Sequence, residues 1–208
     1  MLISLHRDDK GTFYPENTKE KLPTFNGLGK GQGFNVNIAW ETGTVVNEYD
    51  RSGNIPAELG AHEYKHAFEE LVLPLAHEFK PDVILVSCGF DSGIGDPIGL
   101  SRLCPMMYFW MTHMLSQVCD KIIVVQEGGY NCDFLKYHAE GVLKALLLQN
   151  SQSDPNLQEA FGEPTPADLA AGITSIAGID SNLAQPWAKE NVEETKCHHR
   201  AYWKCLQH

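Results

Sequence analysis

The chain contains 208 residues, and its 27 acidic and 16 basic side chains give a formal net charge of −11. With 43% apolar residues it is too hydrophobic for a disordered chain, and at roughly 150 residues per domain its length predicts about one domain. An acidic surface repels phosphate backbones and anionic lipids, so this composition argues against direct nucleic-acid binding and membrane association and weakly favours Lys-rich and Arg-rich partners.

Strand and helix signals alternate from the first residues onward. Residues 2–6 form a short apolar run that is typical of a strand inside a sheet, and residues 34–40 alternate apolar with polar side chains, which predicts a strand with one buried face. Residues 41–56 are predicted to form a loop. An amphipathic helix is predicted for residues 57–80, because the apolar side chains there follow helical spacing. These side chains are Tyr64, Phe68, Leu71, Val72, Leu75 and Phe79.

Two further strands, each followed by a helix, complete the regular part of the chain. Continuous apolar runs at residues 83–88 and 122–125 are typical of parallel strands that are covered on both faces. Helices are predicted for residues 103–118 and 134–149. The alternation predicts an α/β fold with three layers, in which helices cover both faces of a mostly parallel sheet. In such sheets ligands bind at the carboxyl ends of the strands.

The signals weaken after residue 150. A polar loop, a helix at residues 167–176 and a tail rich in His, Cys and Trp are predicted there. The sequence has six cysteines but no CxxC pair, and it shows no signal peptide and no apolar run of about 18 residues. We therefore expect reduced thiols and an intracellular protein of the nucleus or the cytoplasm.

Two loops at the predicted strand ends carry the residues best suited to chemistry. Residues 89–97 follow one buried strand and contain Asp91, and residues 127–130 follow the next strand and end in Tyr130. An Asp in a glycine-flanked loop can bind zinc, and a tyrosine hydroxyl can donate a hydrogen bond to a developing oxyanion. The alternative is purely structural: Asp91 and Asp96 would cap turns, and Tyr130 would be a half-buried aromatic.

Four segments in a fixed order carry a resemblance to a known family. They read ISLHRDDKGTFYP (3–15), GKGQGFNVNI (29–38), SCGFDSGIGDP (87–97) and EGGYN (127–131). In all four the chain resembles the zinc-dependent histone deacetylases, and its ending AYWKCL (201–206) is similar to the close of class II catalytic domains. The resemblance implies an arginase/deacetylase-like fold. It identifies residues 1–208 as the carboxyl-terminal portion of a single catalytic domain, truncated at its amino terminus, with a core over 1–150 and helices and a tail over 151–208.

The resemblance also implies an activity, the zinc-dependent hydrolysis of the acetyl-lysine amide on a histone or another protein. Asp91 corresponds to a zinc ligand of the family, and Tyr130 corresponds to the tyrosine that polarises the acetyl carbonyl and stabilises the tetrahedral oxyanion. Ser4 and the carbonyl of Leu5 correspond to a structural potassium site. The implied partners are acetylated lysine side chains and a corepressor complex, with roles in chromatin and transcription regulation.

The resemblance further implies a tunnel for the acetyl-lysine side chain. Tyr14, Ile98 and Gly129 match positions that contact the substrate there. Phe is the commoner counterpart of Tyr14, so the aromatic wall would remain and would gain a hydroxyl that needs a partner. A tyrosine rather than a histidine at position 130 resembles the active class I and IIb members more than the weakly active class IIa.

The chain departs from the family pattern at its amino end. The family's proton-handling His-His pair and its Asp-x-His pair of zinc ligands precede the segment that begins at residue 1, and this sequence does not contain them there. Catalytic zinc normally has three protein ligands, and a general base contributes roughly 10²–10⁴-fold. His6 lies on the first strand, but its family counterpart is not a ligand. Two hypotheses remain open: a deacetylase whose other ligands belong to an upstream segment, or a catalytically inactive deacetylase-like interaction module or truncated product.

Two other histidine-containing segments were candidates for metal sites. Residues 62–66 (HEYKH) satisfy the HExxH pattern of zinc metalloproteases on a predicted helix. The apolar stripe lies on another face, so both histidines are expected to point to solvent, and Val72 stands where the longer form of the motif requires a third histidine. Residues 197–199 (CHH) with Cys205 fit no usual zinc spacing, so a surface tail is expected.

Overall fold

A computed structural model describes residues 1–14, 18–42, 59–150 and 178–207. The chain forms two compact units, Met1–Phe79 with Ser181–His208, and Lys80–Asp180. Each unit contains one pair of parallel strands, as the α/β prediction requires. None of the helices within the described ranges is long and apolar enough to cross a membrane.

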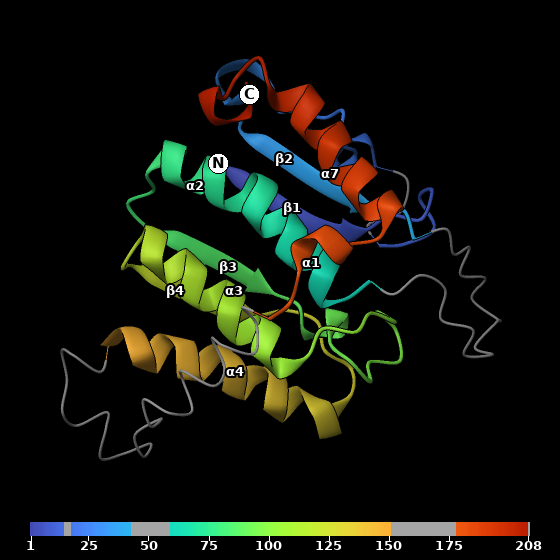
Figure 1. Cartoon of the computed structure of the whole chain (residues 1–208), viewed down its shortest axis with the longest axis vertical. Coiled ribbons are helices and arrows are strands. Elements are labelled where there is room, and N and C mark those ends of the chain that lie inside the picture. The colour runs from blue at the N-terminus through green and yellow to red at the C-terminus, as the bar shows by residue number, and fades with distance from the viewer. Residues whose placement is uncertain (15–17, 43–58, 151–177, 208) are drawn as a thin grey trace. The chain divides into compact units, whose positions relative to one another are not determined.

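The first unit is built on the parallel strands β1 (Leu2–Arg7) and β2 (Asn35–Trp40), which confirm the two strands predicted there. In their register Leu2 pairs with Asn35 and Arg7 with Trp40. The helices are α1 (Ala61–Ala67), a π-helical turn (Phe68–Val72), α2 (Leu73–Phe79) and α7 (Pro186–His199), and α7 lies along β2 (Figure 1). The described residues of this unit also form four short 3-10 turns: Lys19–Lys21, Gly29–Gly31, Ser181–Leu183 and Lys204–Leu206.

The strand β2 is buried on both faces, so the prediction of one solvent face was wrong. Its polar position Asn37 is 2% exposed. The Asn37 amide donates to the carbonyls of Glu20 and Leu22, and the Thr195 hydroxyl of α7 donates to the Asn37 carbonyl at 2.8 Å. The polar residues that alternate along this strand therefore point into the protein and form hydrogen bonds there. They must do so because a buried polar group without a hydrogen-bond partner is costly.

The helix predicted for residues 57–80 is interrupted. Residues 57 and 58 lie outside the described ranges, and the helix begins at Ala61. A proline has no N–H to donate and its ring crowds the carbonyl four residues earlier, so Pro74 disfavours a regular turn before it. The π-helical turn over Phe68–Val72 directly precedes α2 and accommodates this constraint. The apolar stripe is otherwise confirmed, with Leu71 and Leu75 completely buried.

The carboxyl-terminal segment is only in part a surface tail: Cys197 and His198 are exposed, as expected, but His199 and Trp203 belong to the core. His199 at the end of α7 is fully buried, and its ring nitrogens lie 3.0 Å from the Thr195 carbonyl and 2.9 Å from the Asn35 carbonyl. Trp203 donates its ring N–H to the Gly33 carbonyl. Of residues 197–199, His199 packs against β2, because the buried strand needs a cover that residue spacing alone does not reveal.

A buried polar network lies where β1 and β2 end. Arg7 pairs with Asp9, and Lys21 lies 2.6 Å from a carboxylate oxygen of Asp8, with all four side chains nearly buried. Glu41 follows β2 and accepts the Lys10 N–H at 2.9 Å. Burial, followed by the hydrogen bond with Asp8, raises the pKa of Glu41 to about 7.

This raised pKa predicts a pH-dependent stability. The folded chain keeps a proton on Glu41 that the unfolded chain releases above its ordinary pKa of 4.5, so stability falls as pH rises through about 7. Glu41→Gln carries a neutral side chain at every pH, and we expect it to reduce this fall. Urea denaturation at about pH 5 and about pH 8.5 measures the difference between wild type and variant. The exposed Glu20→Gln change is the control, and an equal pH response in all three proteins would contradict the prediction.

The second unit contains β3 (Ile84–Cys88), the 3-10 turn Phe90–Ser92, α3 (Pro105–Val118), β4 (Ile122–Gln126) and α4 (Cys132–Asn150). These elements confirm the predicted strand–helix–strand–helix order. The helices α3 and α4 pack against each other (Figure 1). Their close approach depends on Gly141, because a Cβ at that position would lie 2.3 Å from the Pro105 carbonyl oxygen.

One face of the β3–β4 pair is open in the described residues. Leu85 pairs with Ile123 and Ser87 with Val125, so these four side chains share a face. Leu85 is 70% exposed, and Ile123 and Val125 are more than half exposed. The continuous apolar runs predicted cover on both faces, and this part of the prediction is not met. The helix predicted for residues 167–176 lies outside the described ranges, as does nearly all of the loop predicted for residues 41–56.

Candidate functional site

The loops that follow β3 and β4 lie beside each other in the second unit. The Glu127 N–H donates to the Cys88 carbonyl at 3.1 Å, and the Phe90 N–H donates to the Gly128 carbonyl at 2.9 Å. These bonds continue the parallel ladder beyond the two strands. They bring the turn that carries Asp91 next to the loop that carries Tyr130, as expected for parallel strands that end at one edge.

Two glycines make room for the Asp91 carboxylate. A Cβ at Gly89 would lie 2.5 Å from its Oδ1 atom, and a Cβ at Gly128 would lie 2.7 Å from both its Cγ and Oδ1 atoms. Any other residue at either position would displace the carboxylate. Gly89, in the glycine-flanked loop predicted to present Asp91, therefore has a direct steric reason, and so does Gly128 on the neighbouring loop.

The surroundings of Asp91 raise the pKa of its carboxyl group. Partial burial raises the pKa of this carboxyl, and the charge of Asp96 raises it further, while N–H groups of Asp91 and Ser92 lower it. A half-buried carboxylate with such surroundings is suited to a positive ligand.

Asp91 fits zinc as a single oxygen ligand, but the described part of the chain brings no group of three His, Cys, Asp or Glu side chains together. The residues described here therefore do not form a complete zinc site. No metal-dependent step can be derived from them alone, since a catalytic zinc ion normally has three protein ligands.

Tyr130 is exposed, although the backbone before it is packed. It is 56% exposed, and Gly129 before it has a φ of +129°, which favours glycine. A Cβ at Gly129 would lie 2.9 Å from the Cβ of Phe90 and from a methyl group of Leu135. The backbone before Tyr130 therefore lies against the turn that carries Asp91.

Asp96 connects the two loops, a role that the sequence did not indicate. Its Oδ1 atom accepts the N–H groups of Ile98 and Gly99, as a turn-capping Asp does, at 2.8 and 2.9 Å. Its Oδ2 atom accepts the Tyr130 N–H at 2.7 Å. The turn-cap alternative is thus correct for Asp96, but incomplete. An Asp in a Gly-Asp-Pro string within the loop after β3 was the available signal, and its second partner lies 34 residues away.

Aromatic side chains of α3 and α4 pack against the turn that carries Asp91. The Ser92 and Tyr108 hydroxyls lie 2.7 Å apart, and the buried His138 ring stacks on Phe90. A Cβ at Gly93 would lie 2.4 Å from the His138 ring. His138 is therefore a core residue that packs against the Asp91 turn.

The other predicted site residues fall in both units. Ile98 and Gly129 belong to the same loop pair as Asp91 and Tyr130. Ser4 and Leu5 lie on β1 in the first unit, where the Ser4 hydroxyl is 2.8 Å from the His6 ring. Tyr14, in the same unit, is 85% exposed.

The HExxH segment does not present a metal site. Glu63 is 3% exposed and accepts the N–H groups of Gly60 and Gln185 with its two oxygens, so it caps α1 and holds the start of α7. His62 and His66 are half-buried, which corrects the expectation that both point to solvent. A protease general base needs a free carboxylate, and Glu63 has none to offer.

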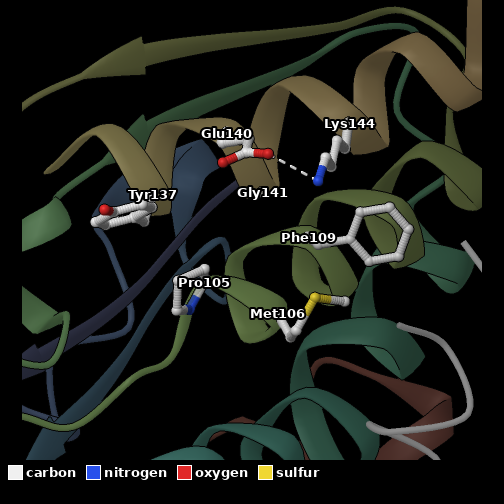
Figure 2. Close-up of a pocket in the computed structure, with 7 residues that line it drawn as sticks. All are labelled: Pro105, Met106, Phe109, Tyr137, Glu140, Gly141 and Lys144. Atoms are coloured by element: carbon white, nitrogen blue, oxygen red, sulfur yellow. Dashed lines mark ion pairs between the residues drawn. The ribbon is translucent and has the colours of Figure 1, made fainter. Parts of the chain in front are cut away.

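A pocket between α3 and α4 lies in the same unit but contains none of the predicted site residues (Figure 2). Its wall is largely apolar, and the Glu140–Lys144 ion pair of 2.8 Å lies on α4 beside it. The lining residues are Pro105, Met106, Phe109, Tyr137, Glu140, Gly141 and Lys144.

The turn that carries Asp91 should tolerate no side chain at Gly99. A Cβ there would lie 1.8 Å from the Asp91 carbonyl oxygen, so Gly99→Ala must move the backbone, and we expect a loss of about 1–3 kcal/mol in the free energy of unfolding. Gly31→Ala is the control, because nothing lies within 4 Å of its Cβ position, and its effect should stay within about 0.5 kcal/mol. Urea denaturation measures both. Equal stabilities of the two variants would show that the turn is not packed as described.

Comparison with known proteins identifies relatives of this chain. The "Histone deacetylase domain" family model matches residues 1–146. Histone deacetylase HDA1 of Saccharomyces cerevisiae is 37% identical over 167 residues, which make up 80% of this chain and 21% of that protein. Polyamine deacetylase HDAC10 of Danio rerio is 31% identical over 209 residues, which cover 100% of this chain and 25% of that protein.

A solved structure supports the same relationship. The histone deacetylase Clr3 matches with a TM-score of 0.73 and 32% identity, covering 98% of this chain and 28% of the Clr3 chain. The expected arginase/deacetylase-like α/β fold is thereby confirmed. The chain spans only 21% and 25% of the length of the two relatives compared by sequence.

Proposed function

Because this chain belongs to the histone deacetylase family, whose model matches residues 1–146, we propose that it supplies Asp91 and Tyr130 to a zinc-dependent protein lysine deacetylase. One observation carries the proposal: the extended β3–β4 ladder places the Asp91 carboxylate against Gly128, two residues before Tyr130. A metal-binding carboxylate and an oxyanion donor on adjacent loops are two of the groups that zinc-dependent amide hydrolysis uses.

The proposed chemistry divides between the metal and the residues of this chain. Bound zinc would supply Lewis acidity and a water of lowered pKa. Asp91 would hold the ion with one carboxylate oxygen in the space left by Gly89 and Gly128. Tyr130 would donate its hydroxyl hydrogen bond to the acetyl oxygen as negative charge develops there. Ile98 and Gly129 would contact the acetyl-lysine side chain.

The remaining assignments complete this proposal. Residues 1–208 would be the carboxyl-terminal portion of one catalytic domain, with its core over 1–150 and helices and a tail over 151–208. Ser4 and the Leu5 carbonyl would hold potassium, and Tyr14 would add an aromatic wall. The substrate would be acetylated lysine on a histone or another protein inside the cell, with a corepressor complex as a further partner.

The other zinc ligands and the general base would come from a segment outside these 208 residues. The adjacent pair His198 and His199 does not replace them, since it lies at the end of α7 and His199 is fully buried in the first unit. We therefore expect the isolated chain, supplied with zinc, to leave an acetyl-lysine peptide intact. This absence of activity is also what a non-catalytic interaction module predicts, so a second experiment must separate the two.

A hybrid enzyme makes that separation. Residues 1–146 replace the matching segment of the Clr3 catalytic domain, which keeps its own upstream segment. We expect the hybrid to hydrolyse an acetyl-lysine peptide, and Tyr130→Phe to lower kcat roughly 100- to 1,000-fold through loss of one oxyanion donor. Tyr137→Phe, at a half-exposed tyrosine of α4, is the matched control and should keep wild-type kcat.

Two results would contradict the deacetylase proposal. A folded, zinc-loaded hybrid without hydrolysis would favour the inactive interaction module, and a Tyr130→Phe hybrid as fast as the parent would remove Tyr130 from the chemistry. An acetylated polyamine is the second substrate to assay, because one relative is a polyamine deacetylase. Faster turnover of the polyamine than of the peptide would correct the substrate class while leaving the roles of Asp91 and Tyr130 in place.

A further inference from the structure

Asp96 is a buried carboxylate whose partners are backbone N–H groups on both loops of the candidate site. It is 7% exposed. One oxygen accepts the N–H groups of Ile98 and Gly99, and the other accepts the Tyr130 N–H at 2.7 Å, the shortest of the three contacts. An ionised carboxylate has acceptor capacity on both oxygens and no hydrogen to donate, so it can serve all three donors at once.

The three backbone N–H groups that donate to Asp96 belong to residues in, or next to, three different parts of the site. Tyr130 carries the proposed oxyanion donor, and Ile98 carries a proposed tunnel side chain. Gly99 touches the turn of the proposed zinc ligand, because its Cβ position lies 1.8 Å from the Asp91 carbonyl oxygen. Asp96 therefore joins metal ligand, oxyanion donor and tunnel wall through one side chain.

A second contact supports the same loop pairing. The Asn131 side-chain amide donates to the Gly95 carbonyl at 2.7 Å, next to Asp96 in the chain. Gly95 has a φ of +87°, and a Cβ there would lie 2.8 Å from the Phe134 ring. The loop before Asp96 is thus packed on the first turn of α4, and its carboxylate is held where it can reach Tyr130.

We propose that Asp96 is the positioning residue of this site: its carboxylate sets the place of the Tyr130 side chain relative to Asp91 and Ile98. The catalytic benefit of this positioning rests on the function proposed above. The positioning itself does not depend on that function. It goes beyond turn capping, because a turn cap needs only the Ile98 and Gly99 bonds. Misplacement by about 1 Å costs on the order of 100-fold in rate, so an exposed tyrosine that serves as an oxyanion donor needs such a restraint.

The restraint is measurable in the full chain without any activity. In the wild-type chain labelled with ¹⁵N and ¹³C, we expect a coupling through the hydrogen bond between the Tyr130 amide nitrogen and the Asp96 carboxylate carbon. This measurement needs no variant and so holds even if a substituted chain fails to fold. Its absence, with the Ile98 and Gly99 couplings present, would reduce Asp96 to a turn cap and overturn the proposal.

The Asp96→Asn variant tests whether the bond positions the side chain. An amide of the same shape offers one acceptor oxygen and one donor nitrogen, so it cannot accept all three N–H groups. We expect hydrogen exchange of the Tyr130 amide to accelerate roughly tenfold or more. We also expect the Tyr130 ring to gain motion in ¹³C relaxation, while the ring of Tyr137 stays unchanged as the internal reference.

Asp133→Asn is the matched control, since Asp133 is exposed and only three residues beyond Tyr130. It should leave both Tyr130 signals as in the wild type. A folded Asp96→Asn chain whose Tyr130 amide and ring are unchanged would overturn the proposal. A Tyr130→Phe hybrid as fast as its parent is a separate outcome. It would remove the catalytic role of Tyr130, but the Tyr130 amide and ring signals would still report whether Asp96 holds Tyr130 in place.

Discussion

The continuation of the β3–β4 ladder past the ends of its strands is the constraint on which the candidate site depends. Two backbone hydrogen bonds, from Glu127 to Cys88 and from Phe90 to Gly128, keep the following loops side by side. Parallel strands end at the same edge, so residues almost 40 positions apart in the sequence become neighbours. The glycines at 89 and 128 then admit the Asp91 carboxylate between these loops.

Buried carboxylates have different partners in the two units. In the first, the buried carboxylates of Asp8 and Asp9 are matched by Lys21 and Arg7, and the network anchors the chain where β1 ends. In the second, backbone N–H groups of Asp91 and Ser92 lower the pKa of Asp91, while burial and the charge of Asp96 raise it. Burying a carboxylate is costly, and such costs are typical of positions kept for a ligand rather than for stability.

The sequence predicted much of the secondary structure, and its failures have identifiable causes. Both strand pairs and the helices α3 and α4 were placed within a few residues. The polar residues of β2 were assigned to solvent because a period of two does not reveal that Asn37 finds carbonyl partners from another segment. The tail was assigned to the surface because the contacts of His199 and Trp203 lie more than 160 residues away in the chain.

For the candidate site, the sequence by itself determined which residue types are available and their order: Asp91, Tyr130 and the glycines beside them, in motifs specific enough to indicate the family. Only the tertiary structure decided that Asp96 accepts hydrogen bonds from both loops, that Glu63 is occupied in capping α1, and that His199 is buried. The physical reason is the same in each case. A carboxylate or imidazole takes its role from the donors and acceptors around it, and chain folding, rather than sequence spacing, brings those partners together.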